Sequence, residues 1–584
     1  MKRANRLRLL ICCLLILGFT FHAIHIQAST VKDEYQVSSG TYYQELQVGQ
    51  QDSPNSMRVM EIDLSDTYTN VEVGYPSSLT TLQETTSQAM KYHQDGHQVA
   101  GAINGGFYYT RNGEPMNLIS KDNRLISAGK VGESNEAYVN ESIAFGIDKN
   151  GQAKIAEYDL DLMFEHQGHT YEITSHNKER KKDNLILYTS SYHNGYADTN
   201  PYGREVVIKT TAAPDLQFGE TYNGEVVAIY KKGDQTDVAI PENGFVLSGN
   251  GDGRTILSNL EAGDSINLSI DINSEWMHSE FMLASGPRLV KDGEVSLSMN
   301  PDSYRASLVA PRTAVAIDAT GEKVFFVTVD GRQPGYSRGM NLSEFARYLV
   351  DLGAEYALNL DGGGSTTMAV RQLGDEKISV VNSPSGGSER GVSTILMGIS
   401  TEPAAQSLYY RDISPGDTHY EGVHWISDKG IKGYEDGSFG PGKSLTRAHA
   451  AIMFTRALDL KTEELTKETS MFKDISTDHP YAEFIHAVDK NGIFKGRDGE
   501  FLPGQSLTRQ QMASTLVNAF DLEKYQASHV DINLGNVGKS HKENVQILAD
   551  LGITNQLNNY RPREAVTRGQ FATFLYLSYQ AVKE

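Results

Sequence analysis

The feature that most constrains this chain is an internal repeat in its C-terminal part. A Thr-Arg pair after an apolar residue recurs at 446–447, 508–509 and 567–568, with spacings of 508 − 446 = 62 and 567 − 508 = 59 residues. Apolar residues at helical spacing follow each pair. A repeat of this length is a supersecondary unit that buries its apolar face against its neighbours. The pattern therefore predicts stacked helical repeats over 409–460, 471–522 and 529–580.

The N-terminus has the pattern of a secretory signal peptide. Basic residues within the first eight positions precede an apolar run from Leu9 to Phe21, and a small-residue cleavage site lies before Ser29. We expect residues 1–28 to be removed on export. Both cysteines, Cys12 and Cys13, lie in this segment, which leaves no disulfide or thiolate site afterwards. No later run approaches the roughly 18 apolar residues of a membrane span, so no transmembrane segment is expected in the mature chain.

Charge and composition exclude one class of partner and indicate a β-rich region. Lys and Arg total 53 against 74 Asp and Glu, a net charge of −21, which argues against nucleic-acid binding. Between residues 57 and 400, short β-rich runs alternate with Gly, Asn and Asp turns. We expect a mostly β domain there, preceded by an N-terminal segment, 29–56, and followed by a linker, 401–408.

Two aspartates in this region follow apolar runs. The run 324–329 ends at Asp330, an amphipathic helix follows with Asn341 or Ser343 as its cap, and the run 356–360 ends at Asp361. This order suits a βαβ crossover, whose parallel strands end at one edge of the sheet. If the strands are neighbours, Asp330 and Asp361 lie about 5 Å apart, which suits the carboxylate pair of a retaining glycosidase. An ordinary Asp-Gly turn is the alternative for Asp330.

The residues after Asp361 favour an anion. Three glycines bring bare backbone amides within reach of a group such as phosphate. Arginines in other Gly-flanked segments could clamp it with bidentate bonds, although an ordinary ion pair is the alternative for each of them. The candidates for phosphate contact are Arg288, Arg312, Arg332, Arg338, Gly362, Gly363, Gly364, Ser365, Thr366 and Asn382.

Several of these segments together closely resemble the phosphodiester glycosidase family. The resemblance covers about residues 57–400 and implies hydrolysis of a sugar 1-phosphodiester at its glycosidic bond, which releases a free sugar and a phosphomonoester. We expect an α+β catalytic domain with a mixed β-sheet, acting on a glycan or teichoic-acid-like phosphodiester. The segments that carry the resemblance, in family order, are 104–107 (NGGF), 311–314 (PRTA), 329–337 (VDGRQPGYS) and 359–365 (NLDGGGS).

The chemistry of this reaction suggests roles for these residues. A phosphate ester leaves as a stable anion, so cationic and amide donors matter more than a strong general acid, while the sugar carbon needs a nearby carboxylate. We assign Asp361 as the leading carboxylate, nucleophile or base, and Asp330 as its partner. Arg312 and Arg338 are expected to hold the phosphate, and Asn104 to orient sugar hydroxyls.

Three alternatives stay open. Asp330, Asp361 and Glu114 could gather a divalent cation, because carboxylates are ligands for hard cations. A phosphodiesterase would use the same arginines but direct water at phosphorus. A non-catalytic envelope protein would only bind polysaccharide.

The C-terminal repeats resemble S-layer homology repeats over about 409–580. This implies an all-α three-repeat module that attaches a secreted bacterial protein to a pyruvylated secondary cell-wall polysaccharide, in the cell wall or S-layer. T-x-x-Q capping boxes place Arg509 and Arg568 at helix starts, where amides and dipole favour anions. A structural tie between repeats is the alternative, and the third repeat lacks the G-Y-x-D-G-x-F loop of the first. The candidates for polysaccharide contact are Arg447, Arg509, Arg568, Tyr420 and Tyr481.

Overall fold

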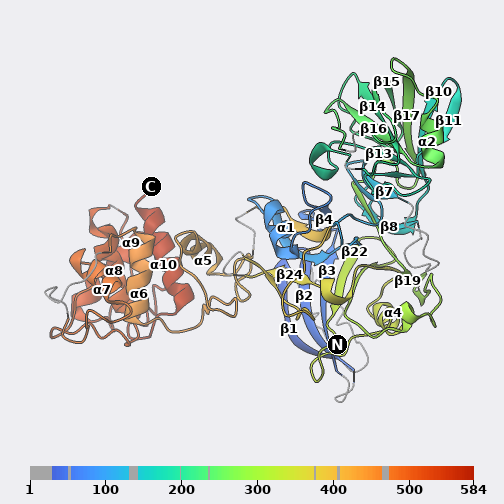
Figure 1. Cartoon of the computed structure of the whole chain (residues 1–584). Helices are drawn as coiled ribbons and strands as arrows, with labels where there is room; N and C mark the ends of the chain where they lie inside the picture. The colour runs from blue at the N-terminus through green and yellow to red at the C-terminus, as the bar shows by residue number, and fades with distance from the viewer. Residues whose placement is uncertain are drawn as a thin grey trace, which may run out of the picture.

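The computed structural model describes residues 29–49, 54–129, 142–197, 199–234, 237–373, 377–403, 408–462, 472–525 and 527–583. The predicted signal peptide, 1–28, lies outside the described residues. A β-rich part is followed by a helical C-terminal part (Figure 1). Within the described ranges, no helix combines the length and the apolar character needed to span a bilayer.

Two antiparallel sheets form the centre of the β-rich part. The eight-stranded sheet has the order β1 (Ser29–Ser38), β2 (Thr41–Val48), β3 (Asn55–Asp63), β22 (Lys323–Val329), β21 (Arg312–Ile317), β23 (Tyr356–Asn359), β19 (Arg288–Lys291) and β20 (Glu294–Val295). The five-stranded sheet has the order β25 (Ile378–Val380), β24 (Met368–Arg371), β5 (Gln98–Asn104), β26 (Ile395–Ser400) and β4 (Thr69–Gly74).

The period-2 alternation of the strands explains why these sheets pack in layers. In β22, Phe326 packs between the two sheets, whereas its neighbours Phe325 and Val327 pack against the opposite core, under α4 (Leu342–Asp351). Helix α1 (Thr85–Tyr92) covers the outer face of the five-stranded sheet. Helix α4 begins at the expected place, because Asn341 and Glu344 form a capping box.

A third sheet is inserted between β5 and β19 and surrounds a core of its own. Its β12–β13 pair is parallel, so this is the mixed sheet of a mostly β region. One short helix, α2 (Asp252–Leu257), packs on β16. The thirteen strands have the order β11 (His169–Glu172), β10 (Leu160–His166), β17 (Ser265–Ile272), β15 (Glu220–Tyr230), β14 (Arg204–Thr210), β16 (Gly244–Gly249), β13 (Leu185–Tyr188), β12 (Ser175–His176), β7 (Arg124–Gly129), β6 (Ile119–Lys121), β18 (Phe281–Ala284), β8 (Ile143–Ile147) and β9 (Ala153–Glu157).

The arrangement of β22, α4 and β23 corrects the expected neighbours. Both strands pair antiparallel with β21, so they run in the same direction but with β21 between them. Asp330 and Asp361 follow strands two positions apart, which corresponds to about 10 Å rather than one strand spacing. The expectation of neighbouring strands is therefore wrong, and the spacing of about 5 Å that depended on it no longer follows.

The N-terminal segment is part of the first sheet. Strands β1 and β2 form a hairpin at its edge, and β2 pairs with β3. The C-terminal part touches this edge, because Arg411 forms a bidentate ion pair with Asp33 (2.9 and 3.1 Å) and lies 3.9 Å from the centre of the Tyr35 ring.

The C-terminal repeats close into a ring rather than an open stack. Leu445 donates its amide to the carbonyl of Val566 (2.9 Å), Leu507 donates to Leu445 (2.9 Å), and Val566 donates to Leu507 (2.8 Å). A linear stack would leave the first and third repeats unpaired at the ends. The helices are α5 (Tyr420–Ser427), α6 (Arg447–Ala457), α7 (Ala482–Lys490), α8 (Arg509–Phe520), α9 (Lys542–Asp550) and α10 (Arg568–Ala581).

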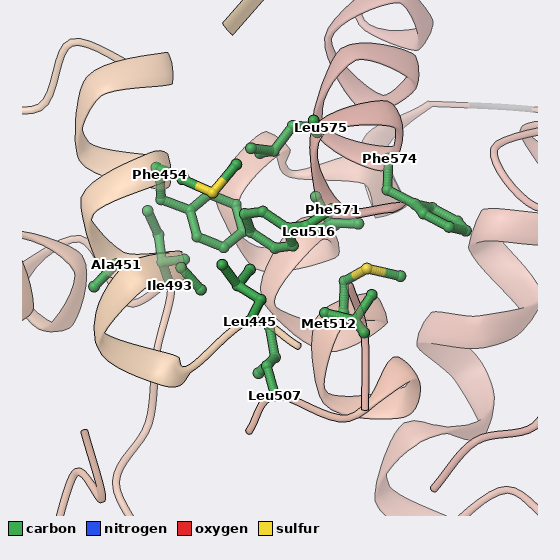
Figure 2. Packing of buried hydrophobic residues seen from close by; sticks show 14 of the residues in the cluster. Leu445, Ala451, Phe454, Ile493, Leu507, Met512, Leu516, Phe571, Phe574 and Leu575 are labelled. Atoms are coloured by element: carbon green, nitrogen blue, oxygen red, sulfur yellow. The ribbon is translucent and has the colours of Figure 1, made fainter. Parts of the chain in front are cut away.

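One phenylalanine joins all three repeats in the core of this ring (Figure 2). Phe454 of α6 is fully buried and meets Phe494 and Phe571 edge to face, at ring-centre distances of 5.9 and 5.2 Å. Such contacts add to the apolar area that each ring buries.

Replacing Phe454 by Ala is expected to lower the free energy of unfolding of the helical module by about 3–5 kcal/mol, because the cavity is shared by three repeats. Urea denaturation of the full chain, followed by helical circular dichroism, measures this loss. Tyr525→Ala, at a 40 % exposed side chain, is the control and is expected to change little. A loss below about 1 kcal/mol for Phe454→Ala would contradict the closed ring.

Candidate active site and wall-binding module

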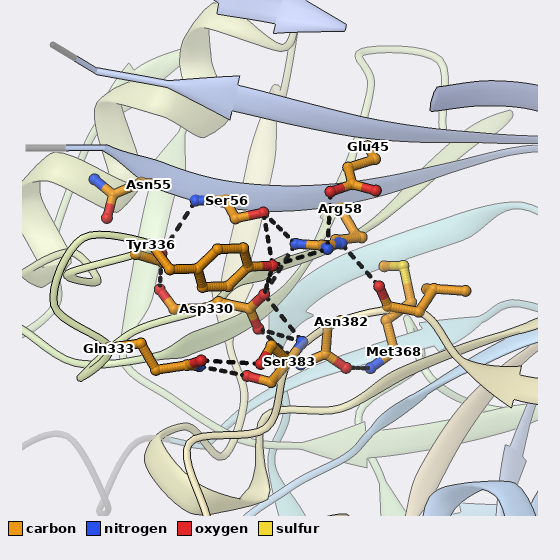
Figure 3. Close-up of polar contacts among 12 residues, drawn as sticks. Glu45, Asn55, Ser56, Arg58, Asp330, Gln333, Tyr336, Met368, Asn382 and Ser383 are labelled. Atoms are coloured by element: carbon orange, nitrogen blue, oxygen red, sulfur yellow. Dashed lines mark hydrogen bonds and ion pairs between the residues drawn. The ribbon is translucent and has the colours of Figure 1, made fainter. Parts of the chain in front are cut away.

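Asp330 lies at the end of β22 in a buried polar network (Figure 3). Its carboxylate pairs with Arg58 Nη1 at 2.9 Å and accepts hydrogen bonds from Tyr336 Oη (3.1 Å) and Asn382 Nδ2 (2.9 Å). The Ser383 amide donates to both carboxylate oxygens at 3.0 Å. Burial raises the pKa of Asp330, while Arg58 and these donors oppose that shift.

These contacts suit a bracing role for Asp330. Arg58 also pairs with Glu45 at 3.0 Å, which ties β2 and β3 to the end of β22. Asn382 extends this network, because its Oδ1 accepts from the Met368 amide (2.8 Å) and its Nδ2 donates to the Thr366 carbonyl (3.1 Å). Thr366 follows the glycine-rich segment, 362–365, so the network holds the end of that segment. The Asn382 side chain and the Thr366 carbonyl thus bond to other groups of the protein in this structure.

Asp361 lies at the end of β23 and lines a cavity of about 160 Å³ with Arg312 and Arg332. Burial raises the pKa of the Asp361 carboxyl to about 6. A carboxyl group with this pKa changes its protonation state close to neutral pH, which is where a general acid or base works best.

Three arginines line this cavity, Arg305, Arg312 and Arg332, and Arg312 and Arg332 leave positive charge for an anion. Arg312 donates from Nε to the Met340 carbonyl (3.0 Å) and from Nη2 to the Leu308 carbonyl (2.5 Å). Burial and repulsion from Arg332 lower the pKa of Arg312 to about 10. Among the described residues, no carboxylate forms an ion pair with Arg312 or Arg332. Such a pair of guanidinium groups is suited to a phosphate.

The glycine-rich segment is shaped by backbone requirements. Gly363 has φ +63°, the left-handed region that favours glycine, and its amide donates to the Pro311 carbonyl at 2.9 Å. Gly364 has no side chain where the Arg390 guanidinium packs against the segment. Ser365 hydrogen-bonds the Asp361 carboxylate, and the charge of Arg390 acts on it as well.

Asn104, at the end of β5, lies beneath this segment. Its Nδ2 donates to the Asp361 carbonyl (2.6 Å), and its Oδ1 accepts from Thr313 Oγ1 (2.9 Å) and the Thr367 amide (3.0 Å). The side chain is fully buried. The structure therefore makes Asn104 a positioning residue for the Asp361 backbone, which corrects the expectation that it orients sugar hydroxyls.

Three predicted residues lie apart from this cavity. Arg338 pairs with Glu344 of α4 at 2.8 Å, and Arg288 lines a different cavity, of about 500 Å³. Glu114 is buried and accepts a hydrogen bond from Tyr192 (3.0 Å), and burial raises its pKa. In the part of the chain that the structure describes, no cluster of three or more His, Cys, Asp or Glu side chains is arranged to hold a metal ion.

Two arginines were missed by the sequence analysis. Arg58 interrupts the apolar run of β3, and a charged residue at such a position signals a buried partner. Arg390 carries no comparable signal, because its segment, 388–391, has the composition of an ordinary polar loop.

The three repeat arginines lie between neighbouring repeats. Each one is stacked on aromatic rings of the next repeat around the ring, and burial lowers the pKa of all three. This geometry is that of a structural tie between repeats, which is the alternative to polysaccharide binding. Each donates from Nε to a carbonyl of that repeat: Arg447 to Phe501 (2.6 Å), Arg509 to Tyr560 (2.9 Å) and Arg568 to Phe439 (2.9 Å).

The two predicted tyrosines differ in exposure. Tyr420 is only 4 % exposed and belongs to the module's core, so stacking of its ring on a sugar is not available, which corrects that expectation. Tyr481 is half-buried and meets His449 and His479 edge to face, each at 5.7 Å.

Replacing Arg58 by Met is expected to cost about 3–5 kcal/mol of unfolding free energy, because Asp330 would be left as a buried, unpaired charge. The matched control is Arg338→Met, whose exposed pair with Glu344 is expected to contribute at most about 1 kcal/mol. Both are measured by urea denaturation in a Trp425→Phe background, where Trp276 is the one remaining tryptophan and reports on the β-rich part. Equal costs for the two variants would refute the bracing role.

Two family models match separate parts of the chain. The family model "Phosphodiester glycosidase" matches residues 220–398, and "S-layer homology domain" matches 409–451, 472–513 and 537–572. A crystal structure of a hypothetical protein from Synechocystis has the same fold over 62 % of this chain and 62 % of that chain, with a TM-score of 0.50 and 20 % identity.

Curated relatives match over shorter stretches. The S-layer protein sap of Bacillus anthracis is 32 % identical over 190 residues, 31 % of this chain and 23 % of that protein. Exoglucanase XynX of Acetivibrio thermocellus is 31 % identical over 153 residues, 25 % of this chain and 14 % of that protein. The chain thus spans less than a quarter of the length of the first curated relatives that it matches. Its two regions identify it as a cell-surface protein that joins a phosphodiester glycosidase domain to three S-layer homology domains.

Proposed function

We propose that this chain is an exported, wall-anchored hydrolase that cleaves the glycosidic bond of a sugar 1-phosphodiester in envelope or external glycans. The observation that carries the proposal is the Asp361 carboxyl, with its pKa of about 6, in a cavity with two arginines that lack a carboxylate partner among the described residues. A positively charged pocket beside a carboxyl group with a raised pKa suits a substrate that carries both a phosphate and an electrophilic sugar carbon.

In this mechanism Arg312 and Arg332 bind the phosphate and stabilise the charge that it gains as it leaves. Asp361 lies beside the sugar carbon and acts as base or nucleophile. Overall, the oxygen of a water molecule bonds to that carbon and the bond from carbon to the phosphate oxygen breaks. The electron pair stays on the phosphate, and the water proton is lost by way of Asp361.

Hydrolysis in ¹⁸O-enriched water tests this assignment. Phosphorus NMR of the purified protein with a panel of sugar 1-phosphodiesters is expected to show an unlabelled phosphomonoester, with the heavy oxygen in the free sugar. Label in the phosphate would mean attack at phosphorus and would overturn the proposal, as would the absence of turnover on every diester.

Replacing Asp361 by Asn is expected to lower kcat/KM by roughly 10²–10⁴-fold without loss of folding, because the carboxylate is the reacting group. In the unchanged protein, kcat/KM is expected to rise with pH up to about 6 and then level off, since the pKa of Asp361 is raised and its ionised form accumulates only above that value. Asp161→Asn, at an exposed aspartate of β10, is the matched control. A flat pH profile, or near-normal turnover of Asp361→Asn, contradicts the assignment.

We further propose that the S-layer homology domains bind a pyruvylated secondary cell-wall polysaccharide. Support comes from the family match and from Arg568, which is the least buried of the three repeat arginines.

A chain that ends at residue 403 is expected to lose sedimentation with purified cell walls while it keeps its turnover of a small diester. Retained turnover is the control for folding, because the core of the helical module contains only residues from Tyr409 onward. Walls stripped of pyruvate are expected to retain the full chain poorly. Equal sedimentation of the two chains would refute the anchor.

A further inference from the structure

A short hairpin between β5 and β6 contributes to the wall of the Asp361 cavity. It consists of residues 107–116, and its ends are joined because the Met116 amide donates to the Phe107 carbonyl at 2.8 Å. Phe107 lines the cavity together with Asp361. We call residues 107–116 the Phe107 loop.

The Phe107 loop also reaches the groups that hold Asp361. Tyr108 is buried, and its Oη donates to the Gly391 carbonyl (3.1 Å) and lies 3.4 Å from Ser365 Oγ. Ser365 in turn hydrogen-bonds the Asp361 carboxylate. A shift of this loop therefore changes both the cavity wall and the surroundings of the hydroxyl that contacts Asp361.

A buried lysine of the inserted region holds the loop from the other side. Lys178 directly follows the segment after β12, and its Nζ donates to the Pro115 carbonyl. Gly129 leaves room for the lysine stem, because a Cβ there would lie 3.0 Å from Lys178 Cγ. Burial lowers the pKa of Lys178 to about 8, and the charge of Glu114 opposes that shift. A buried ammonium needs protein groups in place of water, and Pro115 and Glu114 of the loop are such groups.

The residues beside Lys178 make weaker contacts with the same loop. Glu179 forms an ion pair with Arg111, and Lys181 Nζ lies 5.4 Å from the centre of the Tyr109 ring. These side chains lie at the surface, where such contacts contribute little. Lys178 is therefore the main attachment of the Phe107 loop to this segment.

We propose that Lys178 is a positioning residue for the hydrolase: by holding the Phe107 loop, it keeps the cavity wall closed beside Asp361. This inference rests on the proposed function. Among the described residues that line the cavity, none belongs to the strands of the inserted sheet. The inserted sheet thus acts on the site only through the loop that it holds.

Replacing Lys178 by Met tests this role in the full-length protein with a sugar 1-phosphodiester. Hydrogen exchange of residues 107–116, followed by mass spectrometry, is expected to become about tenfold faster, because the Pro115 carbonyl loses its donor. We expect kcat to fall by roughly 10–100-fold, since a small displacement of the wall misplaces the reacting groups.

The pH profile separates positioning from a loss of stability. Burial is the main cause of the raised pKa of Asp361, so water that enters past a loosened loop lets this carboxyl ionise at lower pH. The rise of kcat/KM with pH is therefore expected to move down by about half a pH unit or more in Lys178→Met. The charged side chains that line the cavity or act on Asp361 are unchanged in this variant, namely Arg305, Arg312, Arg332 and Arg390.

Arg180→Met is the matched control, because it removes another buried cation two residues further along. Arg180 pairs with Glu205 of β14 and donates to Ser248 Oγ of β16 (2.6 Å), so its bonds lie within the inserted sheet. It is expected to lower stability and to leave both the pH profile and the exchange of the Phe107 loop unchanged. Tyr192→Phe, which removes only the hydroxyl that donates to Glu114, replaces Lys178→Met if that variant does not fold, and a smaller shift in the same direction is expected.

Faster exchange of the Phe107 loop without a change in kcat or in the pH profile refutes the positioning role and leaves the hydrolase intact. Unchanged exchange refutes the attachment itself. Equal effects of Lys178→Met and Arg180→Met also refute the inference, because they indicate a general loss of stability. Absence of turnover by the unchanged protein refutes the hydrolase, and with it the importance of Lys178 for the reaction, while exchange alone still decides the attachment.

Discussion

The Asp361 cavity depends on a buried ion pair that lies outside it, between Arg58 and Asp330. Two charges removed from water are stable only when every remaining donor and acceptor is satisfied, and here the partners come from segments far apart in the sequence. One of them, Asn382, in turn holds the Thr366 carbonyl directly after the glycine-rich segment. The contacts that neutralise the Asp330 carboxylate thereby also fix the segment that follows Asp361.

The two aspartates illustrate how surroundings decide the role of a residue type. Asp330 is 1 % exposed and bonded by an arginine, a tyrosine and two donors of one loop, so its negative charge is already used. Asp361 has Ser365, the Gly362 amide and the charge of Arg390 around it, borders a cavity, and keeps its proton to about pH 6. The two aspartates therefore have different roles: Asp330 holds the structure together, and Asp361 is available for chemistry.

The sequence was informative where the determinants are local. The apolar runs before Asp330 and Asp361, the helix that begins after Asn341, and the Thr-Gln capping at residue 567 all depend on residues within one turn or one strand. The position of β21 between β22 and β23 does not, because strand order depends on long-range pairing that no local pattern encodes. For the same reason, the sequence could not separate Arg312 from Arg338. Arg312 lines the Asp361 cavity, whereas α4 supplies Glu344 as the partner of Arg338.

The closed ring of repeats explains how a degenerate third repeat still contributes to the structure of the module. Its altered loop ends in Tyr560, whose carbonyl accepts the Nε bond of Arg509, as the Phe439 and Phe501 carbonyls do for the other arginines. The third repeat also supplies Arg568 to the first. Removing it would open two interfaces and expose the Phe454 ring, which meets Phe571 from that repeat. In a ring, a repeat that keeps its apolar face, its arginine and one aromatic residue completes the structure, so its other loop residues are free to change.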